Sequence, residues 1–352
     1  MSTEVQCRVL DQCGGCPRWS TPETARRTHL HELVHAVVRH APDHVHLSSS
    51  PVGWRHRLTL RPDPEGRLGM SAHRSHTVVA LPGCPVAHPL LERALRTLPP
   101  LPGPAEVELR TDGQRVVCVI RSRSNHGRRR GGRPPSREAL HAISPDTVDG
   151  VVVDGRTWRG QGALSIPVAD RMFRASPGSF FQVHLEINNA IVSWIRPRLE
   201  QLRPAHMLDL YSGIGNLGLS LADTAGGVTL IESSRSSVED ARHNAREFGV
   251  KADIRKGDAH RFQAGDAFFD VALLDPPRRG AGKVLSQLAL TLPRAIVYIA
   301  CDPHSLARDI STLTRTSNYR IAELAVFEMF PWAAHVETVA LLTRGGSPLH
   351  TA

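Results

Sequence analysis

Short apolar runs alternate with segments of helical periodicity from about residue 176 onward. The runs predict strands over 207–210, 228–231, 271–274 and 296–300, and the periodic segments predict a helix that starts at 216–222 and another over 236–248. Such alternation is typical of a parallel sheet wrapped by helices. Two final runs, 320–327 and 336–343, predict an antiparallel hairpin.

The first half of the chain has a mixed pattern. One helix is predicted over 22–40, because its apolar residues share one face: Leu30, Leu33, Val34, Val37 and Val38. Short strands are predicted over 57–61, 77–81, 106–109 and 115–120, with Gly and Pro between them. We therefore expect an α+β domain over residues 1–175 and an α/β domain over residues 176–352.

The composition is that of a globular protein, with 41% hydrophobic and 22% charged residues. No apolar run approaches the ~18 residues of a membrane-spanning helix, and the N-terminus lacks the apolar region of a signal peptide. We therefore expect a cytoplasmic monomer without a membrane partner.

A formal net charge of +9 favours a polyanionic partner such as nucleic acid. Only three of the 43 basic residues are lysines, and genome composition can also produce such an arginine bias. Seven arginines and no acidic residue lie within 121–137, among Gly, Pro and Ser. This segment predicts a surface loop, which either binds phosphates or is a solvated insertion without a binding role.

Six cysteines without an export signal favour metal binding or catalysis over disulfides. Four of them form a candidate ligand set: Cys7, Cys13, Cys16 and Cys84. Their spacing fits zinc as well as an iron-sulfur cluster. Cys118 lies within an apolar run and is expected in the core.

Cys301 directly follows the predicted strand 296–300, and Asp275 directly follows the strand 271–274. The carboxyl ends of strands in a doubly wound sheet line its ligand crevice. A cysteine at such a position is presented to a substrate as a nucleophile. The alternative is a buried structural cysteine, which behaves as a small hydrophobic residue.

A glycine-rich segment follows the strand 207–210. Gly213, Gly215 and Gly218 satisfy the G-x-G-x-x-G pattern of nucleotide sites. Two acidic residues favour S-adenosyl-L-methionine over a dinucleotide. Asp209 lies four residues before the first glycine and suits a cationic ligand. Glu232 ends the next strand, where it can reach ribose hydroxyls. Asp258 is expected beside the adenine. The alternative is a turn with acids that face solvent.

Six motifs, in this order, resemble those of the uracil-5 RNA methyltransferases. They are Phe180-Phe181-Gln182, Leu208 to Gly218, Ile231-Glu232, Leu274 to Gly280, Cys301-Asp302-Pro303, and Phe330-Pro331-x3-His335-Val336-Glu337. The resemblance implies a Rossmann-like class I methyltransferase domain and an N-terminal α+β domain that holds an iron-sulfur cluster and binds RNA.

The resemblance also implies residue roles. Cys301 would add to carbon-6 of uracil, and Glu337 would remove the proton from carbon-5. The residues implied to contact the cofactor or the target base are Gln182, Tyr211, Asn216, Glu232 and Asp275. The four cysteines look like the [4Fe-4S] ligands of the branch that acts on 23S ribosomal RNA, so a cluster is favoured over zinc. Transfer RNA is the alternative substrate.

The chain departs from the family pattern at three places. The family often begins with a small RNA-binding β-barrel, whereas six residues precede Cys7, so RNA binding is expected from the arginine-rich domain. Ala333-Ala334 replace a common Thr before the final motif, and Arg55-His56-Arg57 matches an upstream segment only loosely.

Three other functions compete with this interpretation. A cytosine-5 RNA methyltransferase would carry a cysteine close to the acidic Pro-Pro turn, and none lies there. An amino-group methyltransferase would carry an aromatic residue after the Pro-Pro turn, where this chain has Arg278. A non-catalytic iron-sulfur RNA-binding protein would not need both Cys301 and Glu337.

Overall fold

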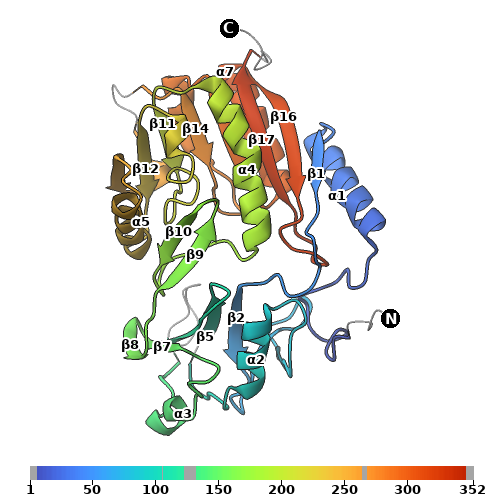
Figure 1. Ribbon diagram of the computed structural model, residues 1–352. Helices are drawn as coiled ribbons and strands as arrows, with labels where there is room; N and C mark the ends of the chain where they lie inside the picture. Colours follow the sequence, from blue (N-terminus) through green and yellow to red (C-terminus); the bar gives the residue numbers. More distant parts are fainter. Residues whose placement is uncertain (1–5, 105, 123–131, 264–267, 346–352) are drawn as a thin grey trace.

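The structure is a computed structural model that describes residues 6–104, 106–122, 132–263 and 268–345. The part of the arginine-rich segment from residue 123 to 131 lies outside the described residues. The chain forms a larger lobe around an eight-stranded sheet and a smaller lobe around a seven-stranded sheet (Figure 1).

The sheet of the larger lobe has the order β1-β16-β17-β15-β14-β11-β12-β13. Its strands are β1 (His44–His46), β11 (Met207–Leu210), β12 (Val228–Glu232), β13 (Ala252–Lys256), β14 (Val271–Leu274), β15 (Ala295–Ala300), β16 (Tyr319–Phe327) and β17 (Glu337–Arg344). β17 pairs antiparallel with both β15 and β16, while the remaining pairs are parallel. The predicted parallel sheet and terminal hairpin are therefore confirmed.

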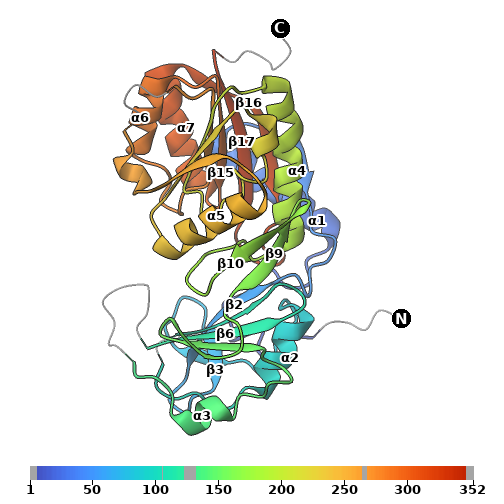
Figure 2. The ribbon, with the colours of Figure 1, turned by 60° about the vertical axis from the view of Figure 1, so that its left-hand side comes forward.

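Helices cover both faces of this sheet (Figure 2). One core contains residues of α4 (Leu185–Leu202) and α5 (Arg235–Glu247), and the other contains residues of α1 (Glu23–Val38), α6 (Val284–Thr291) and α7 (Pro303–Ser317). Neighbouring residues of one strand face opposite cores: Leu273 lies in the first and Leu274 in the second. Because both faces are covered, the central strands are mostly apolar, and Asp209 of β11 is a buried exception.

The larger lobe includes α1 and β1, which the predicted boundary at residue 175 assigns to the other domain. β1 pairs with β16, and Leu30 and Val34 of α1 are buried in the same core as α7. The amphipathic pattern of α1 predicts a buried face, but it does not say which surface will cover that face. The boundary at residue 175 is therefore wrong for residues 23–46.

The smaller lobe contains the sheet β4-β3-β2-β5-β6-β7-β8. Its strands are β2 (Arg57–Pro62), β3 (Leu68–Ser71), β4 (Val78–Ala80), β5 (Glu106–Thr111), β6 (Val116–Arg121), β7 (Gly150–Val153) and β8 (Arg156–Arg159), and its helices are α2 (Pro89–Thr97) and α3 (Arg137–His141). Cys118 is fully buried in its core, as expected.

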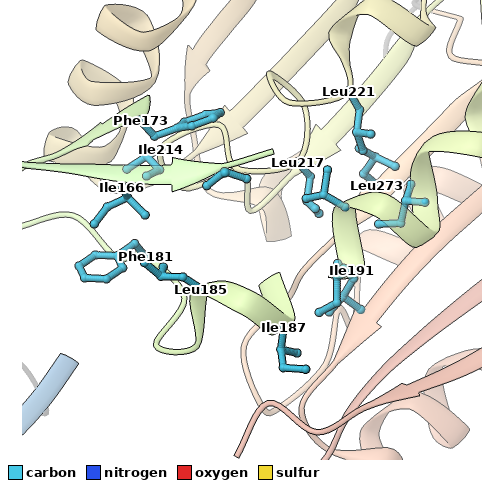
Figure 3. Packing of buried hydrophobic residues seen from close by; sticks show 14 of the residues in the cluster. Ile166, Phe173, Phe181, Leu185, Ile187, Ile191, Ile214, Leu217, Leu221 and Leu273 are labelled. Carbon is cyan, nitrogen blue, oxygen red and sulfur yellow. The ribbon is translucent and has the colours of Figure 1, made fainter. Parts of the chain in front are cut away.

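A two-stranded hairpin, β9 (Leu164–Val168) and β10 (Arg171–Ala175), lies between the lobes (Figure 2). Figure 3 shows how its side chains Ile166 and Phe173 join one core with Phe181, Leu217 and Leu273. This core thus ties the hairpin to the segment before α4 and to the glycine-rich segment after β11.

The predicted helix at 216–222 is absent. The segment after β11 forms consecutive turns that end in a short 3₁₀ helix, Ala222–Thr224. Gly215 has a φ of +89°, and a side chain at Gly218 would approach the Asp209 Oδ2 to 2.7 Å. The glycines therefore let the backbone turn tightly against Asp209, which is incompatible with a regular helix there. Among the strands and α-helices of the larger lobe, the sequence did not anticipate β1, β13, α4, α6 and α7.

Candidate active site

The carboxyl ends of the central strands meet at one edge of the large sheet. Leu210 of β11 pairs with Leu274 of β14, and Leu274 pairs with Tyr298 of β15. The residues that follow these strands, among them Tyr211 and Asp275, therefore lie side by side at this edge. Here the parallel strands reach the crevice in which open α/β folds bind ligands.

Cys301 and Glu337 face one another across β15 and β17. Ala300 is paired with Thr338, whose Oγ1 donates a hydrogen bond of 2.9 Å to the Ala300 carbonyl. Cys301 directly follows Ala300, and Glu337 directly precedes Thr338 as the first residue of β17, so both lie next to the last pair of the ladder. The sheet therefore brings the predicted nucleophile and the predicted base together.

The Cys301 thiol is half-buried between two acids and one cation. Burial and, to a smaller extent, the nearby Glu337 raise the pKa of this thiol to about 11, whereas Arg278 lowers it. A thiol becomes a strong nucleophile only as the thiolate. Activation of Cys301 therefore depends on Arg278 and on keeping the nearby carboxyl groups neutral.

Two carboxyl groups share this space. Glu337 is only 4% exposed, and burial followed by the nearby Asp275 raises its pKa well above the ordinary value. Burial also raises the pKa of Asp275 to about 7. Gln182 Nε2 donates a hydrogen bond of 3.1 Å to the Asp275 Oδ2, which acts in the opposite direction and lowers this pKa. Carboxyl groups with raised pKa values can exchange protons near neutral pH.

Arg278 contacts the loop that leads to Glu337. Its Nη2 donates to Nε2 of His335 over 3.0 Å, and the His335 ring lies edge-on to Phe330 at 5.9 Å. Arg278 comes from the segment after β14, so this contact joins two of the motifs that were identified separately in the sequence. It agrees with a role for His335 in orienting the final loop.

The cofactor residues expected near the glycines gather at the ends of β11 and β12. Glu232 accepts hydrogen bonds from the Gly213 and Ser234 amides, at 3.0 and 2.6 Å. Tyr211 has a φ of +63°, and its buried hydroxyl has no hydrogen-bond partner among the described residues. Strained backbone and an unpaired polar group are typical of ligand sites.

The remaining expected cofactor residues differ in their placement. Asp258 is exposed and caps a short 3₁₀ helix by accepting from the His260 amide, and the His260 ring lies 5.8 Å from that of Tyr211. Asn216 lies apart from this group and exchanges two amide hydrogen bonds of 2.9 Å with Asn188 of α4. The partner Asn188 was not anticipated, because nothing in its local sequence distinguishes it.

The Asp209 side chain is almost completely buried. Its Oδ2 accepts from the Gly218 amide at 2.8 Å, and its Oδ1 has no partner in the described part of the chain. Burial raises the pKa of Asp209 to about 8. One carboxyl oxygen therefore holds the glycine turn, and the other remains for a cationic group.

This burial predicts a pH-dependent stability. Asp209 and Asp275 have folded-state pKa values of about 8 and about 7, above the ordinary 3.8, so the folded state holds protons that the unfolded chain releases. Stability should fall as pH rises through the window from about 4 to 8. We expect the Tm of the ligand-free protein to drop by several degrees between pH 5 and pH 8, measured by calorimetry.

Asp209→Asn cannot ionise, so its Tm should change less with pH than that of the parent protein. The exposed Asp253, on β13 at the far edge of the sheet, provides the matched control Asp253→Asn. Equal pH slopes for the parent and Asp209→Asn would contradict the assignment.

The four cysteines of the candidate ligand set surround one cavity of about 30 Å³. All four are free thiols, and Arg55 lines the same cavity. Burial, together with the neighbouring Cys84, Cys13 and Cys7, raises the pKa of Cys16 to about 12. Within the described ranges, no group of three or more His, Cys, Asp or Glu side chains is arranged to hold a metal ion.

A cleft of about 800 Å³ extends from this cavity, between the lobes, to Arg278 and His335. Arg55 lines both the cavity and the cleft. Arg57 places its guanidinium 4.3 Å from the ring centre of Phe180, a side chain that is 49% exposed. The sequence did not reveal this pair, because its members come from β2 and from the segment before α4.

Two family descriptions match parts of the chain. Residues 259–345 match the family described as tRNA (uracil-5-)-methyltransferase, and residues 170–295 match the methyltransferase small domain. None of the helices in the described ranges combines the length and apolar character of a bilayer span.

Similar proteins cover most of the chain. The 23S rRNA (uracil(1939)-C(5))-methyltransferase RlmD of Pseudomonas putida is 30% identical over 379 residues, which is 97% of this chain and 80% of that protein. An uncharacterized RNA methyltransferase of Streptomyces coelicolor is 36% identical over 301 residues, which is 82% of this chain but only 63% of that protein.

A solved structure has the same fold. The Pyrococcus abyssi tRNA (uracil-54, C5)-methyltransferase, in complex with S-adenosyl-L-homocysteine, superposes with a TM-score of 0.75 and 22% identity, covering 94% of this chain and 86% of that chain. This likeness confirms the α/β methyltransferase fold with an additional N-terminal β domain. The 30% identity to RlmD over nearly the whole chain confirms the resemblance: the chain belongs to the uracil-5 RNA methyltransferases, a family of S-adenosylmethionine-dependent enzymes.

Proposed function

We propose that this protein methylates carbon-5 of a uridine in RNA, and that the substrate is 23S ribosomal RNA. The observation that carries the proposal is the place of Cys301 directly after β15 and of Glu337 at the start of β17, next to the Ala300–Thr338 pair and beside Asp275 and Arg278. A non-catalytic RNA-binding protein would have no need to bury a carboxyl group against a thiol.

The reaction needs a nucleophile because carbon-5 of uracil reacts too slowly with a methyl donor by itself. The Cys301 sulfur adds to carbon-6 and forms an enolate, which makes carbon-5 nucleophilic. S-adenosylmethionine supplies the methyl group as an electrophilic sulfonium. Once carbon-5 carries both the methyl group and its hydrogen, Glu337 takes that proton, and the bond between sulfur and carbon-6 breaks to release Cys301.

The neighbouring groups fit the charges that develop in this sequence. Arg278 is the cation beside Cys301, and it stabilises the thiolate and the enolate oxygen. The raised pKa of Glu337 makes it a stronger base than an exposed carboxylate. Asp275, held by Gln182, is placed to bind the polar edge of the uracil.

Cofactor binding would use the group at the ends of β11 and β12. Glu232 would bind the ribose hydroxyls, and Tyr211 and Asp258 would border the adenine. Gln182 and Asn216 are assigned to the cofactor or the target base on family resemblance. The Asp209 Oδ1 and the Tyr211 hydroxyl, for which the described part of the chain provides no partner, support this position, since buried polar groups normally have partners.

RNA would enter through the cleft between the lobes. Phe180 provides an exposed aromatic face in this cleft. Positive charge comes from the arginines that line it: Arg55, Arg57, Arg61, Arg121 and Arg278. Arg121 is engaged with Glu106 and Glu108, at 2.9 and 3.3 Å. A single-stranded or looped segment suits such a cleft, because the target base must leave its stack.

The choice of 23S rRNA depends on the RlmD relatives, which match nearly the full chain. The match of residues 259–345 to a tRNA family supports transfer RNA as the second candidate. That match covers the catalytic end of the large lobe and leaves out the four cysteines.

For the cysteine cavity we propose a [4Fe-4S] cluster on Cys7, Cys13, Cys16 and Cys84, in preference to zinc. The four free thiols around one cavity, with the Arg55 guanidinium beside them, suit a group of net negative charge. The methyl transfer requires no redox step, so the role of the cluster would be structural and in RNA binding.

Mass mapping of 5-methyluridine tests the proposed function. In cells that lack the gene, one 5-methyluridine of 23S rRNA should disappear, and the parent gene should restore it while the Cys301→Ala gene should not. Loss confined to transfer RNA would reassign the substrate to tRNA. Unchanged 5-methyluridine in both RNAs would exclude the proposed activity.

A further inference from the structure

The loop between β16 and β17, residues 328–336, carries His335 and leads directly to Glu337. Among the contacts of this loop, two come from residues 16–48, which we name the N-terminal strap. The strap is distant in sequence from the loop, so the contacts form only in the folded protein.

The first contact joins two tryptophans. The Trp19 ring packs on the Trp332 ring with 4.3 Å between their centres, and the Arg18 amide donates to the Trp332 carbonyl over 2.9 Å. Trp332 has a φ of +62° and is 8% exposed. A bulky residue stays in this left-handed conformation only when its surroundings hold it there.

The second contact anchors the start of the loop. The buried Glu328 accepts from Arg26 Nη1 at 2.5 Å and from the Ser48 amide at 3.1 Å. The Glu328 amide in turn donates to the His46 carbonyl at 2.9 Å. Side chain and backbone of Glu328 are thus both bound by the strap.

The strap begins at the cysteine cavity. Trp19 lines this cavity, and its amide donates to the Cys16 carbonyl over 3.2 Å. From the cavity a continuous set of contacts therefore runs through Trp19 and Trp332 to the loop that carries His335.

We propose that Trp19 and Trp332 are positioning residues, which hold loop 328–336 so that Glu337 stays opposite Cys301 and His335 stays on Arg278. The proposal rests on the proposed function, because it assigns the tryptophans to the step in which Glu337 removes the proton. It also gives the cysteine-bearing segment a mechanical role in catalysis.

Trp19→Ala tests the proposal by kinetics. We expect kcat for RNA methylation to fall about tenfold to a hundredfold, since small displacements of a catalytic group have effects of this size. KM for S-adenosylmethionine should not change, because the cofactor residues lie at the ends of β11 and β12, whereas Trp19 packs on Trp332 in the loop between β16 and β17. Trp19→Phe should retain most of kcat, and Trp19→Ala with Trp332→Ala should cost little more than either change alone.

The matched control is Trp158→Ala, which removes a tryptophan that is 38% exposed on β8 of the smaller lobe. It should leave kcat at the parent value. A parent-like kcat for Trp19→Ala, or an equal loss for Trp158→Ala, would overturn the proposal.

Hydrogen exchange provides a second measurement that needs no activity. The amides of residues 328–336 should exchange faster in Trp19→Ala than in the parent, while those of β11 and β12 should not change. Unchanged exchange in the loop would also overturn the proposal. If the parent itself does not methylate RNA, the proposed function fails, and the exchange experiment still decides whether the strap holds the loop.

Discussion

The Glu337→Gln protein is expected to transfer the methyl group and then stall, with RNA bound covalently through Cys301. Glutamine keeps the shape of the side chain but cannot accept the proton from carbon-5, so the bond between sulfur and carbon-6 cannot break. Loss of a general base should lower turnover by about 10² to 10⁴-fold. A denaturant-resistant band that carries label from the methyl donor would reveal the adduct.

Cys301→Ala should bind cofactor and RNA but form neither product nor adduct, and the adduct should vanish in the double mutant. Glu239→Gln is the matched control, because Glu239 lies exposed on α5 and pairs with Arg235 of the same helix. Parent-like turnover of Glu337→Gln, or activity that survives in Cys301→Ala, would contradict the mechanism.

Cys84→Ser should lose the metal centre. Anaerobically purified parent protein is expected to be brown and to contain about four iron and four sulfide ions per chain, as in a [4Fe-4S] cluster. Serine removes one of the four thiolates around the cavity, so iron, sulfide and the visible absorbance should all fall towards zero. Metal analysis and absorbance spectra measure this loss.

Cys118→Ala is the control for Cys84→Ser. Cys118 is buried in the core of the smaller lobe and does not line the cavity, so its variant should keep the iron. Stoichiometric zinc without iron in the parent protein would show that the four cysteines bind zinc. An iron content that Cys84→Ser leaves unchanged would remove Cys84 from the ligand set.

The two predictions depend on different parts of the molecule. Cys301 and Glu337 are joined by the pairing of adjacent strands, whereas the cysteine cavity combines Cys7, Cys13 and Cys16 with the distant Cys84. A failed metal prediction would leave the chemistry of Cys301 intact. If the adduct does not form, the prediction of a metal centre at the four cysteines is unaffected.

The sequence alone determined most elements of the large sheet and placed the candidate residues at their ends. Alternation of apolar runs and helical periodicity is a local signal, so β11, β12, β14 and β15 could be predicted with nearly their observed bounds. Asp275 and Cys301 were identified because each directly follows a predicted strand, whereas Glu337 was assigned from the family resemblance. Parallel strand order then predicts that such residues share one edge.

Only the tertiary structure decided which distant surfaces meet. Arg26 contacts Glu328 across 302 positions, and β1 from the first half of the chain adds an edge strand to the large sheet while α1 packs in one of its cores. The glycine-rich segment forms turns instead of a helix, because Gly218 packs on the buried Asp209. Periodicity shows that a face will be buried, whereas the identity of its partner depends on packing over the whole chain.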